Sequence, residues 1–257
     1  MWWKKIVLFQ IDLDRIIVIY VTQGILVIFF AIVAYQILKR RRQRINLIFS
    51  GFFLSMIIGF LFNMSYAVIS PEQEEFVIFL HFLSWFFVSF GTIFLLIVHM
   101  IILESTLIYS IKRQNRYILL YGLLLFIGML IQILIPSPLV GIKLTPSGRP
   151  GWTLIFFLYV IAITSGFSII PIITTSFKIY HRFETIALRK KWFYYLVGSL
   201  GLIIFNFYPI QILNFLTGIM PENEVLDTMR LIIVVSGVSV ILWGLLMYYG
   251  IGSKLKD

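Results

Sequence analysis

Long apolar segments dominate this chain and restrict the folds that it can adopt. Seven of them reach about 20 residues, the length that an α-helix needs to cross the roughly 30 Å hydrocarbon core of a bilayer. The chain is 60% hydrophobic and only 12% charged, whereas soluble domains carry about 25% charged residues. The sequence therefore predicts an all-α polytopic membrane protein, with one domain over residues 1–257 and seven transmembrane helices. These are expected at about residues 16–38, 45–69, 76–111, 117–135, 152–177, 192–219 and 231–250.

Basic residues are distributed unevenly among the predicted connections, and their distribution indicates the orientation. If the N-terminus is outside, the inner segments 39–44, 112–116, 178–191 and 252–257 hold five, three, five and two of the 21 Lys and Arg residues. Short connections rich in Lys and Arg remain in the cytoplasm. We therefore expect an outside N-terminus, an inside C-terminus and a multi-pass protein of the cell membrane. Topology then explains the net charge of +10, and nucleic acid is not expected as a partner.

The first inner connection, "KRRRQR", is the most basic one. A basic cluster beside a membrane attracts anionic headgroups, with about 1 kcal/mol for each Lys or Arg near the surface. The alternative is that the cluster only enforces the topology. The residues predicted to contact anionic lipid are Lys39, Arg40, Arg41, Arg42 and Arg44.

Polar side chains gather in the half of the predicted bundle that faces outside. An amide or imidazole that faced lipid would leave its donors and acceptors unpaired, so these groups should point inward. One interpretation is a small polar cavity, open to the outside, that binds a ligand. The other is a set of interhelical hydrogen bonds that only fasten the bundle. The candidate ligand-binding residues are Gln23, Asn63, His81, Gln132, Gln211 and Asn214.

The third helix is expected to run unbroken from residue 76 to residue 111, which is longer than a bilayer requires. His99 then lies at the inner boundary of the lipid, and Glu104 lies beyond it among basic connections. We expect Glu104 to pair with a Lys or Arg of the segments 39–44 or 178–191. The alternative is a buried proton carrier.

Several kinds of chemistry lack the residues that they need. The chain has no cysteine, and its three histidines are scattered, so thiolate, iron–sulfur, bis-histidine haem and zinc sites are not predicted. Neither a nucleophile–base set nor a phosphate-binding glycine loop is present. The predicted helix cores contain no lysine that could hold retinal. We therefore expect no catalytic residues, no metal and no cofactor.

The seven-helix plan with an outside N-terminus, together with the basic run "RFETIALRKKWFYYLVGSLG", resembles the seven-helix sensory regions that precede prokaryotic histidine kinases. In that family an output domain follows the last helix. Here the chain stops shortly after its last apolar segment, so the resemblance implies a sensory role that needs a separate protein partner.

Three functional hypotheses follow. The first is a non-enzymatic, sensor-like bundle with an outward cavity for a small ligand and a cytoplasmic or membrane protein partner. The second is a transporter or permeation subunit, for which polar groups should continue to the inner side. The third is a structural or lipid-interacting subunit of a membrane complex.

Overall fold

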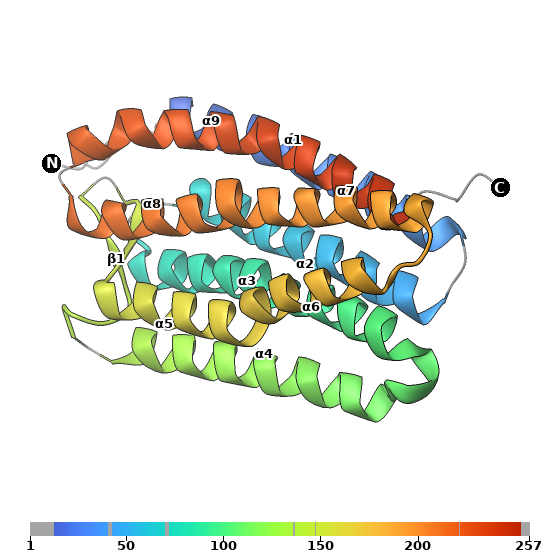
Figure 1. Ribbon diagram of the computed structural model, residues 1–257. Coiled ribbons are helices and arrows are strands. Elements are labelled where there is room, and N and C mark those ends of the chain that lie inside the picture. Colours follow the sequence, from blue (N-terminus) through green and yellow to red (C-terminus); the bar gives the residue numbers. More distant parts are fainter. Residues whose placement is uncertain are drawn as a thin grey trace, which may run out of the picture.

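The structure, a computed structural model, describes residues 13–40, 43–69, 72–135, 137–146, 148–220 and 222–252. Its helices run lengthwise beside one another in an elongated bundle (Figure 1). The elements in chain order are α1 (Leu13–Arg40), α2 (Arg44–Ala67), α3 (Glu74–Ile108), α4 (Ile111–Leu134), β1 (Ile142–Leu144), β2 (Pro150–Trp152), α5 (Leu154–Thr164), η2 (Ser165–Ile169), α6 (Ile170–Arg182), α7 (Ile186–Leu202), η3 (Ile203–Phe207), α8 (Tyr208–Ile219), α9 (Glu222–Met247) and η4 (Tyr248–Gly252).

Within the described residues, six helical segments are long and apolar enough to cross a membrane. They correspond to the first six predicted helices, and a shorter apolar stretch, Val235–Ile251, lies in α9 and η4. The all-α class is thus confirmed, and the six segments are compatible with a multi-pass membrane protein, while the count of seven and the orientation remain predictions. The six segments are Ile19–Lys39, Arg44–Ala67, Glu74–Ser105, Ile111–Leu134, Leu154–Arg182 and Ile186–Ile219.

Large apolar side chains cover much of the outside of the bundle. Ile28 on α1 is 62% exposed and Leu119 on α4 is 61% exposed. Exposing apolar area to water is unfavourable by about 25 cal/mol per Å², and an extended apolar surface marks contact with a partner or a membrane. Such a surface is compatible with an integral membrane protein whose helices face hydrocarbon.

Two helices of the bundle change their winding just before a proline. Pro171 and Pro209 lie in the first turns of α6 and α8, and the wider π turns η2 and η3 precede them. Proline has no N–H to donate to the preceding turn. A π turn is a wider helical turn that accompanies the missing hydrogen bond here. Such turns are frequent at functional sites. In this fold α5, η2 and α6 form one continuous rod, and α7, η3 and α8 form another.

The third helix departs from its predicted course. Ser105 has φ 68° and ψ 161°, which are not helical angles, and α3 ends at Ile108. Ser110 then caps α4, because its hydroxyl oxygen accepts a hydrogen bond from the backbone N–H of Arg113 at 3.2 Å. The prediction of one unbroken helix over 76–111 is therefore wrong, and α4 begins at Ile111 rather than near residue 117.

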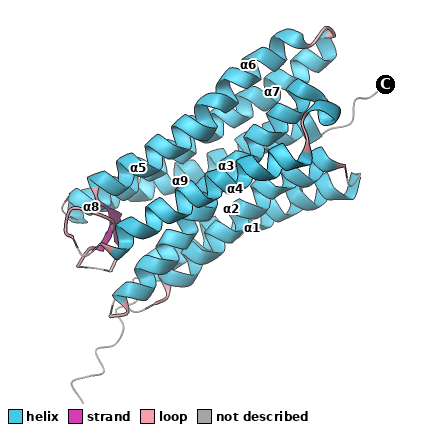
Figure 2. Cartoon of the chain, turned by 90° about the horizontal axis from the view of Figure 1, so that it is seen from below, coloured by secondary structure: helices cyan, strands magenta, loops and turns pink. Residues whose placement is uncertain are grey.

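The connection between α4 and α5 contains an antiparallel β-hairpin. Ile142 pairs with Trp152 and Leu144 with Pro150. Figure 2 shows these strands at one end of the bundle, beside α8. Gly151 of β2 packs so closely against Gly218 of α8 that a Cβ on either residue would overlap the neighbouring backbone. The hairpin therefore caps this end of the bundle, which we call the hairpin end.

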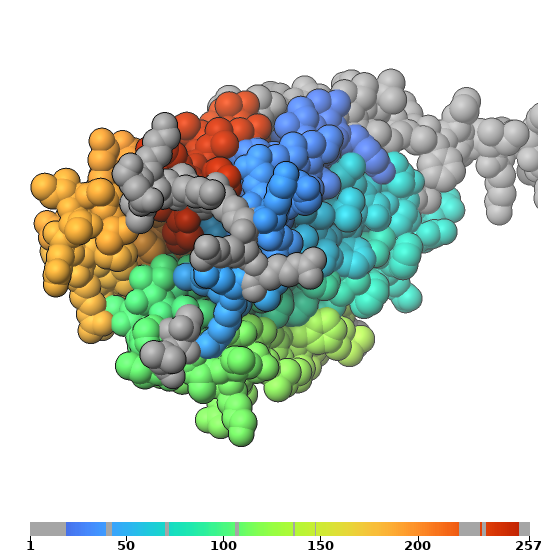
Figure 3. Space-filling view, turned by 90° about the vertical axis from the view of Figure 1, so that its right-hand side faces the viewer, coloured from blue at the N-terminus to red at the C-terminus, as the bar shows by residue number. Residues whose placement is uncertain are grey.

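The opposite end carries the basic connections. There the start of α2, the turn from α3 to α4 and the connection between α6 and α7 meet (Figure 3). Its described basic residues include Arg44, Arg113, Arg182 and Arg189. We call it the basic end.

Candidate functional site

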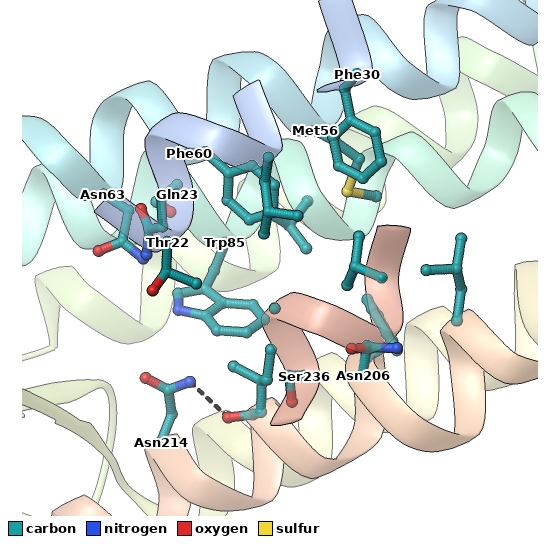
Figure 4. A pocket seen from close by; sticks show the side chains of 18 of the residues that line it. Thr22, Gln23, Phe30, Met56, Phe60, Asn63, Trp85, Asn206, Asn214 and Ser236 are labelled. Atoms are coloured by element: carbon teal, nitrogen blue, oxygen red, sulfur yellow. Dashed lines mark hydrogen bonds between the residues drawn. The ribbon is translucent and has the colours of Figure 1, made fainter. Parts of the chain in front are cut away.

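A cavity of about 250 Å³ extends from the hairpin end toward the middle of the bundle. Its walls come from α1, α2, α3, α7, η3, α8 and α9, with single contributions from α6 and the residues before and in β2. Elements that are distant in the sequence thus converge on one space, as Figure 4 shows. No residue of α4 or α5 is among the described residues that line it.

Three of the six predicted ligand-binding residues line this cavity. Gln23 comes from α1, Asn63 from α2 and Asn214 from α8. Figure 4 shows Gln23 and Asn63 close together above the Trp85 ring and Asn214 below it. Asn214 donates a hydrogen bond from Nδ2 to the carbonyl oxygen of Ile210 at 2.7 Å, which orients its amide.

The cavity is more polar at the hairpin end and mostly apolar toward the middle of the bundle. Farther along, Phe30, Met56 and Leu95 form its walls, and the first two lie beyond Trp85 in Figure 4. A mostly apolar wall with a few placed polar groups is typical of small-molecule sites. The volume is slightly below the roughly 300–1,000 Å³ of drug-sized sites, which indicates a small ligand.

One buried amide deep in the cavity has an unused hydrogen-bonding atom. Asn206 on η3 is 4% exposed, and its Oδ1 accepts a hydrogen bond from the hydroxyl of Ser239 on α9 at 3.0 Å. Asn206 shares this donor with the carbonyl oxygen of Ser236, which lies 3.0 Å from the same hydroxyl. Its Nδ2 has no partner among the described residues. An unpaired buried donor is unfavourable by about 1–3 kcal/mol, so a group that accepts this hydrogen bond would be stabilised here.

Asn206 and Arg149 line the cavity although they are absent from the predicted set of site residues. The sequence signal for Asn206 is an amide near the middle of the predicted helix 192–219. Arg149 carries no comparable signal, because it lies in the long connection whose hairpin the sequence does not reveal. Its backbone N–H donates to Thr145 Oγ1 at 3.1 Å within the turn of this hairpin.

His81 lies beside the cavity rather than in its wall. The indole Nε1–H of Trp152 donates to His81 Nε2 at 3.0 Å. Nε2 is therefore the acceptor, and Nδ1 carries the proton that faces the hydroxyl of Tyr66 at 3.1 Å. The Tyr66 and Trp85 side chains line the cavity. His81 thus joins α2, α3 and β2 and positions two residues of the wall.

Gln132 and Gln211 are buried but are not among the described residues that line the cavity. Gln211 is fully buried, and neither of its amide atoms has a partner among the described residues. Gln132 Oε1 likewise has none. Buried polar groups of this kind commonly bind ordered water. The sequence predicts both residues at the depth of the cavity, but neither belongs to its described wall.

A compact polar cluster closes the bundle below the cavity. His99 on α3 lies one helical turn beyond Leu95, which lines the cavity. Its Nδ1 faces the carbonyl oxygen of Ile172 at 3.2 Å, and its Nε2 lies 2.8 Å from the hydroxyl of Tyr195. Trp192 donates from Nε1 to the carbonyl oxygen of Ser176 at 2.9 Å. These contacts fasten α3, α6 and α7 to one another.

Glu104, at the basic end, forms an ion pair with Arg113 at 2.6 Å between Oε2 and Nη1. The expectation of a partner from segments 39–44 or 178–191 is therefore wrong. The chain turns after Ser105 and brings the start of α4 beside Glu104. Because both side chains are partly exposed, this pair contributes about 0–1 kcal/mol.

Arg44 is held by the protein at the same end. Its Nε donates to Gln114 Oε1 at 2.8 Å, and its Nη1 donates to the carbonyl oxygen of Tyr109 at 2.6 Å. The guanidinium groups of Arg44 and Arg113 also lie within 6 Å of the Tyr109 ring. Burial raises the pKa of the Tyr109 hydroxyl to about 12, although Arg113 opposes the shift.

The other residues predicted to contact anionic lipid are less well defined. Lys39 is exposed, with its ammonium group 5.9 Å from the centre of the Tyr35 ring. Arg40 ends α1, and its side chain, like Arg41 and Arg42 as a whole, lies outside the described residues. Contact between this segment and lipid remains a prediction.

Within the part of the chain that the structure describes, no group of three or more His, Asp or Glu side chains could hold a metal ion. Comparison of the chain with protein-family models gave no match, and comparison with curated proteins gave no significant match. The function must therefore be inferred from the geometry of the cavity and of the two ends of the bundle.

Proposed function

We propose that this protein is a non-enzymatic, sensor-like module of the cell membrane that binds a small ligand in the cavity. The observation that carries this proposal is the convergence of Gln23, Asn63 and Asn214, from three helices, on one mostly apolar space. A site of this kind fixes a ligand through a few polar contacts and excludes water around the rest of it. Ligand binding is favoured over simple fastening because these three amides do not hydrogen-bond to one another in the structure.

The proposed orientation places the hairpin end outside and the basic end in the cytoplasm. Arg44, Arg113, Arg182 and Arg189 lie at the basic end, and positively charged connections are retained on the cytoplasmic side. The polar end of the cavity then faces outside. A ligand would reach Gln23 and Asn63 from the medium or from the outer leaflet.

Closure of the lower half of the bundle favours a sensor over a transporter. The described lining does not extend beyond Phe52 on α2 and Leu95 on α3 toward the basic end. Below that depth Phe49, His99 and Tyr195 are fully buried and packed against one another. A permeation pathway needs a polar route through to the other side. In this conformation the described residues leave no such route.

The rod formed by α7, η3 and α8 connects the cavity with the basic end. Asn206 and Asn214 lie on the part of the rod that lines the cavity, while α7 begins at Ile186, beside the basic connection. A ligand that binds one arrangement of this rod more tightly than another shifts the population toward it. We propose that a cytoplasmic or membrane protein partner reads this shift at the basic end, as the resemblance to histidine-kinase sensory regions implies.

A binding experiment on the purified protein in lipid nanodiscs tests the proposal. A panel of small polar metabolites and small amphiphiles is screened for an increase in Tm, because a ligand that binds only the folded state stabilises it. A Ser236→Leu variant should abolish the increase, since Ser236 is buried in the cavity wall.

A Val238→Leu variant is the matched control, because Val238 lies on the same helix and is 71% exposed. It should respond to ligand as the unmodified protein does. The proposal is contradicted if no compound of either class raises Tm. It is also contradicted if the Tm increase persists in the Ser236→Leu variant.

A further inference from the structure

The cavity follows the bundle axis for much of the length of its helices. Its lining residues run from Ile19 to Phe30 on α1 and from Ser84 to Leu95 on α3. Each interval corresponds to roughly 16 Å along a helix axis. A volume of about 250 Å³ spread over this length leaves a narrow space. An unbranched chain fits such a space, whereas a fused ring system needs more width.

The wall of the cavity offers no free charge to a ligand. Arg149 is the one charged residue among the described lining residues, and it already has an interaction of its own. The other polar side chains of the described wall are uncharged amides, hydroxyls and an indole. A buried charge without an opposite charge or hydrogen bonds is strongly unfavourable. The described wall therefore favours a ligand without net charge.

Two amide atoms of the wall have no partner among the described residues, one toward each end of the cavity. Gln23 Oε1, at the polar end, is a buried acceptor of this kind. Asn206 Nδ2 is a buried donor of this kind, on a side chain that is 4% exposed. Figure 4 shows Asn206 farther along the cavity than Gln23 and Trp85. A ligand that donates at Gln23 and accepts at Asn206 would relieve both unpaired groups, which are unfavourable when buried.

The wall between these two atoms is apolar. Leu26 lies about one turn beyond Gln23 on α1, and Ile210 lies between Asn206 and Asn214 on the rod of α7, η3 and α8. Both apolar side chains line the cavity and can surround hydrocarbon. Asn214 belongs to the polar end, eight residues from Asn206, which corresponds to roughly 12 Å along the helix axis. The two polar groups of a ligand would thus be separated by a hydrocarbon segment of about this length.

Building on the proposed function, we propose that the ligand is a neutral, unbranched chain molecule that donates a hydrogen bond to Gln23 at its outer end and places an oxygen at Asn206 at its inner end. Hydrocarbon occupies the space between its two polar groups. A chain with one polar end leaves one of the two buried amides unpaired. Molecules of this chemistry come from the medium or from the membrane itself.

A pair of alcohols isolates the contribution of the inner oxygen. Decan-1-ol and decane-1,10-diol have the same chain, and only the diol has an oxygen at both ends. Binding to the protein in phosphatidylcholine nanodiscs is measured by isothermal titration calorimetry, with empty nanodiscs as the blank for partitioning. We expect the diol to bind about ten-fold more tightly, the effect of one hydrogen bond to a buried group. Decanoate should bind more weakly than decan-1-ol, because its carboxylate brings an unpaired charge to the cavity.

Substitution of Asn206 assigns the preference for the diol to one side chain. Asn206→Leu should make the affinities for decan-1-ol and the diol equal while both still bind. The Ser239 hydroxyl keeps the carbonyl oxygen of Ser236 as a partner in this variant. Gln211→Leu is the matched control, because Gln211 is a fully buried amide of the same rod that is not among the described lining residues. It should retain the preference for the diol.

The outer contact is tested with a ligand that lacks the donor. In 1-methoxydecane an ether replaces the hydroxyl of decan-1-ol, so this compound accepts hydrogen bonds but donates none. We expect it to bind about ten-fold more weakly than decan-1-ol. Gln23→Leu should abolish this difference. Val238→Leu, at an exposed position of α9, should preserve it.

The outcomes distinguish this inference from the proposed function. Equal affinities for decan-1-ol and the diol in the unmodified protein overturn the inference, as does tighter binding of decanoate than of decan-1-ol. If none of these chains binds while another small compound raises Tm in a manner that Ser236→Leu abolishes, the inference falls and the proposed function stands. If no compound binds, both fall.

Mass spectrometry of extracts from freshly purified protein identifies the source of the ligand. A retained neutral single-chain compound that the diol displaces supports the inference. Its presence in the total lipid of the same membranes indicates a membrane source, and its absence there indicates the medium. A retained anionic or two-chain lipid that the diol displaces overturns the inference.

Discussion

The hydroxyl of Tyr195 on α7 lies 2.8 Å from Nε2 of His99 on α3, one helical turn below the cavity. His99 Nδ1 also lies 3.1 Å from the Thr175 hydroxyl. Because the carbonyl oxygen of Ile172 can only accept, a neutral ring carries its proton on Nδ1 and accepts from Tyr195 through Nε2. All four residues are buried. A single imidazole therefore joins α3, α6 and α7 at the depth where the cavity ends.

Removing the Tyr195 hydroxyl should destabilise the protein. Tyr195→Phe leaves His99 Nε2 buried without its donor, so we expect the free energy of unfolding to fall by about 1–3 kcal/mol. Titration with SDS in mixed micelles measures this change. Tyr194→Phe is the control, because Tyr194 is less buried and packs its ring against Tyr249. Equal effects of the two substitutions would contradict the assigned role of His99.

The hydrogen bond from Trp152 to His81 should hold the hairpin against α3. Trp152→Phe removes the indole donor and should reduce the free energy of unfolding by about 1–3 kcal/mol, measured in the same titration. Trp243→Phe is a matched change, since Trp243 Nε1 has no partner among the described residues. It should have a smaller effect. A larger loss for Trp243 than for Trp152 would show that the hairpin is not anchored in this way.

Close packing of the hairpin against α8 gives a steric prediction. In Gly218→Ala the new Cβ would overlap the backbone carbonyl of Trp152, and overpacking of this kind typically destabilises by about 1–3 kcal/mol. In Gly24→Ala nothing lies within 4 Å of the new Cβ, so the free energy of unfolding should increase by about 0.5–1 kcal/mol. Thermal unfolding in nanodiscs compares the two. Opposite signs are expected, and a stabilised Gly218→Ala protein would contradict the packing.

Tyr109 should make the basic end sensitive to alkaline pH. Burial raises its pKa from the ordinary value of 10.0 to about 12 in the folded protein. Between these pH values the unfolded state has lost the phenol proton and the folded state retains it, so stability falls as pH rises from about 10 to about 12. We expect Tyr109→Phe to lose less stability over this interval, measured by SDS titration at each pH. Parallel profiles for the two proteins would refute this.

Hydropathy allows the helices to be predicted but not their breaks. Segments of apolar residues give the approximate position of a spanning helix, because the bilayer fixes its length. Nothing comparable marks Ser105, where the chain leaves helical geometry at a residue type that occurs in ordinary helices. This break in the helix changes the partner of Glu104. Glu104 meets Arg113 rather than a more distant basic connection.

The predicted depth of a polar residue gives its height along the bundle but not the direction in which it faces around its helix. For this reason only part of the cavity can be predicted from the sequence. Gln23, Asn63 and Asn214 have the predicted height and face the cavity. His81 and Gln211 have a similar predicted height and lie outside the described wall. The side of a helix that faces its neighbours depends on packing between segments that are distant in sequence. That packing also brings Arg149 into the wall, through a hairpin whose strands are only three residues long.

Accessibility of one cavity residue from the two sides of the membrane tests the central claim most directly. The chain has no cysteine, so Asn63→Cys introduces a single thiol at the polar end of the cavity. In intact cells a membrane-impermeant thiol reagent should label it from outside, and the second substitution Ser236→Leu should slow the labelling. Labelling of Asn63→Cys only after the cytoplasmic side is exposed, or no labelling from either side, would contradict an outward-facing ligand cavity.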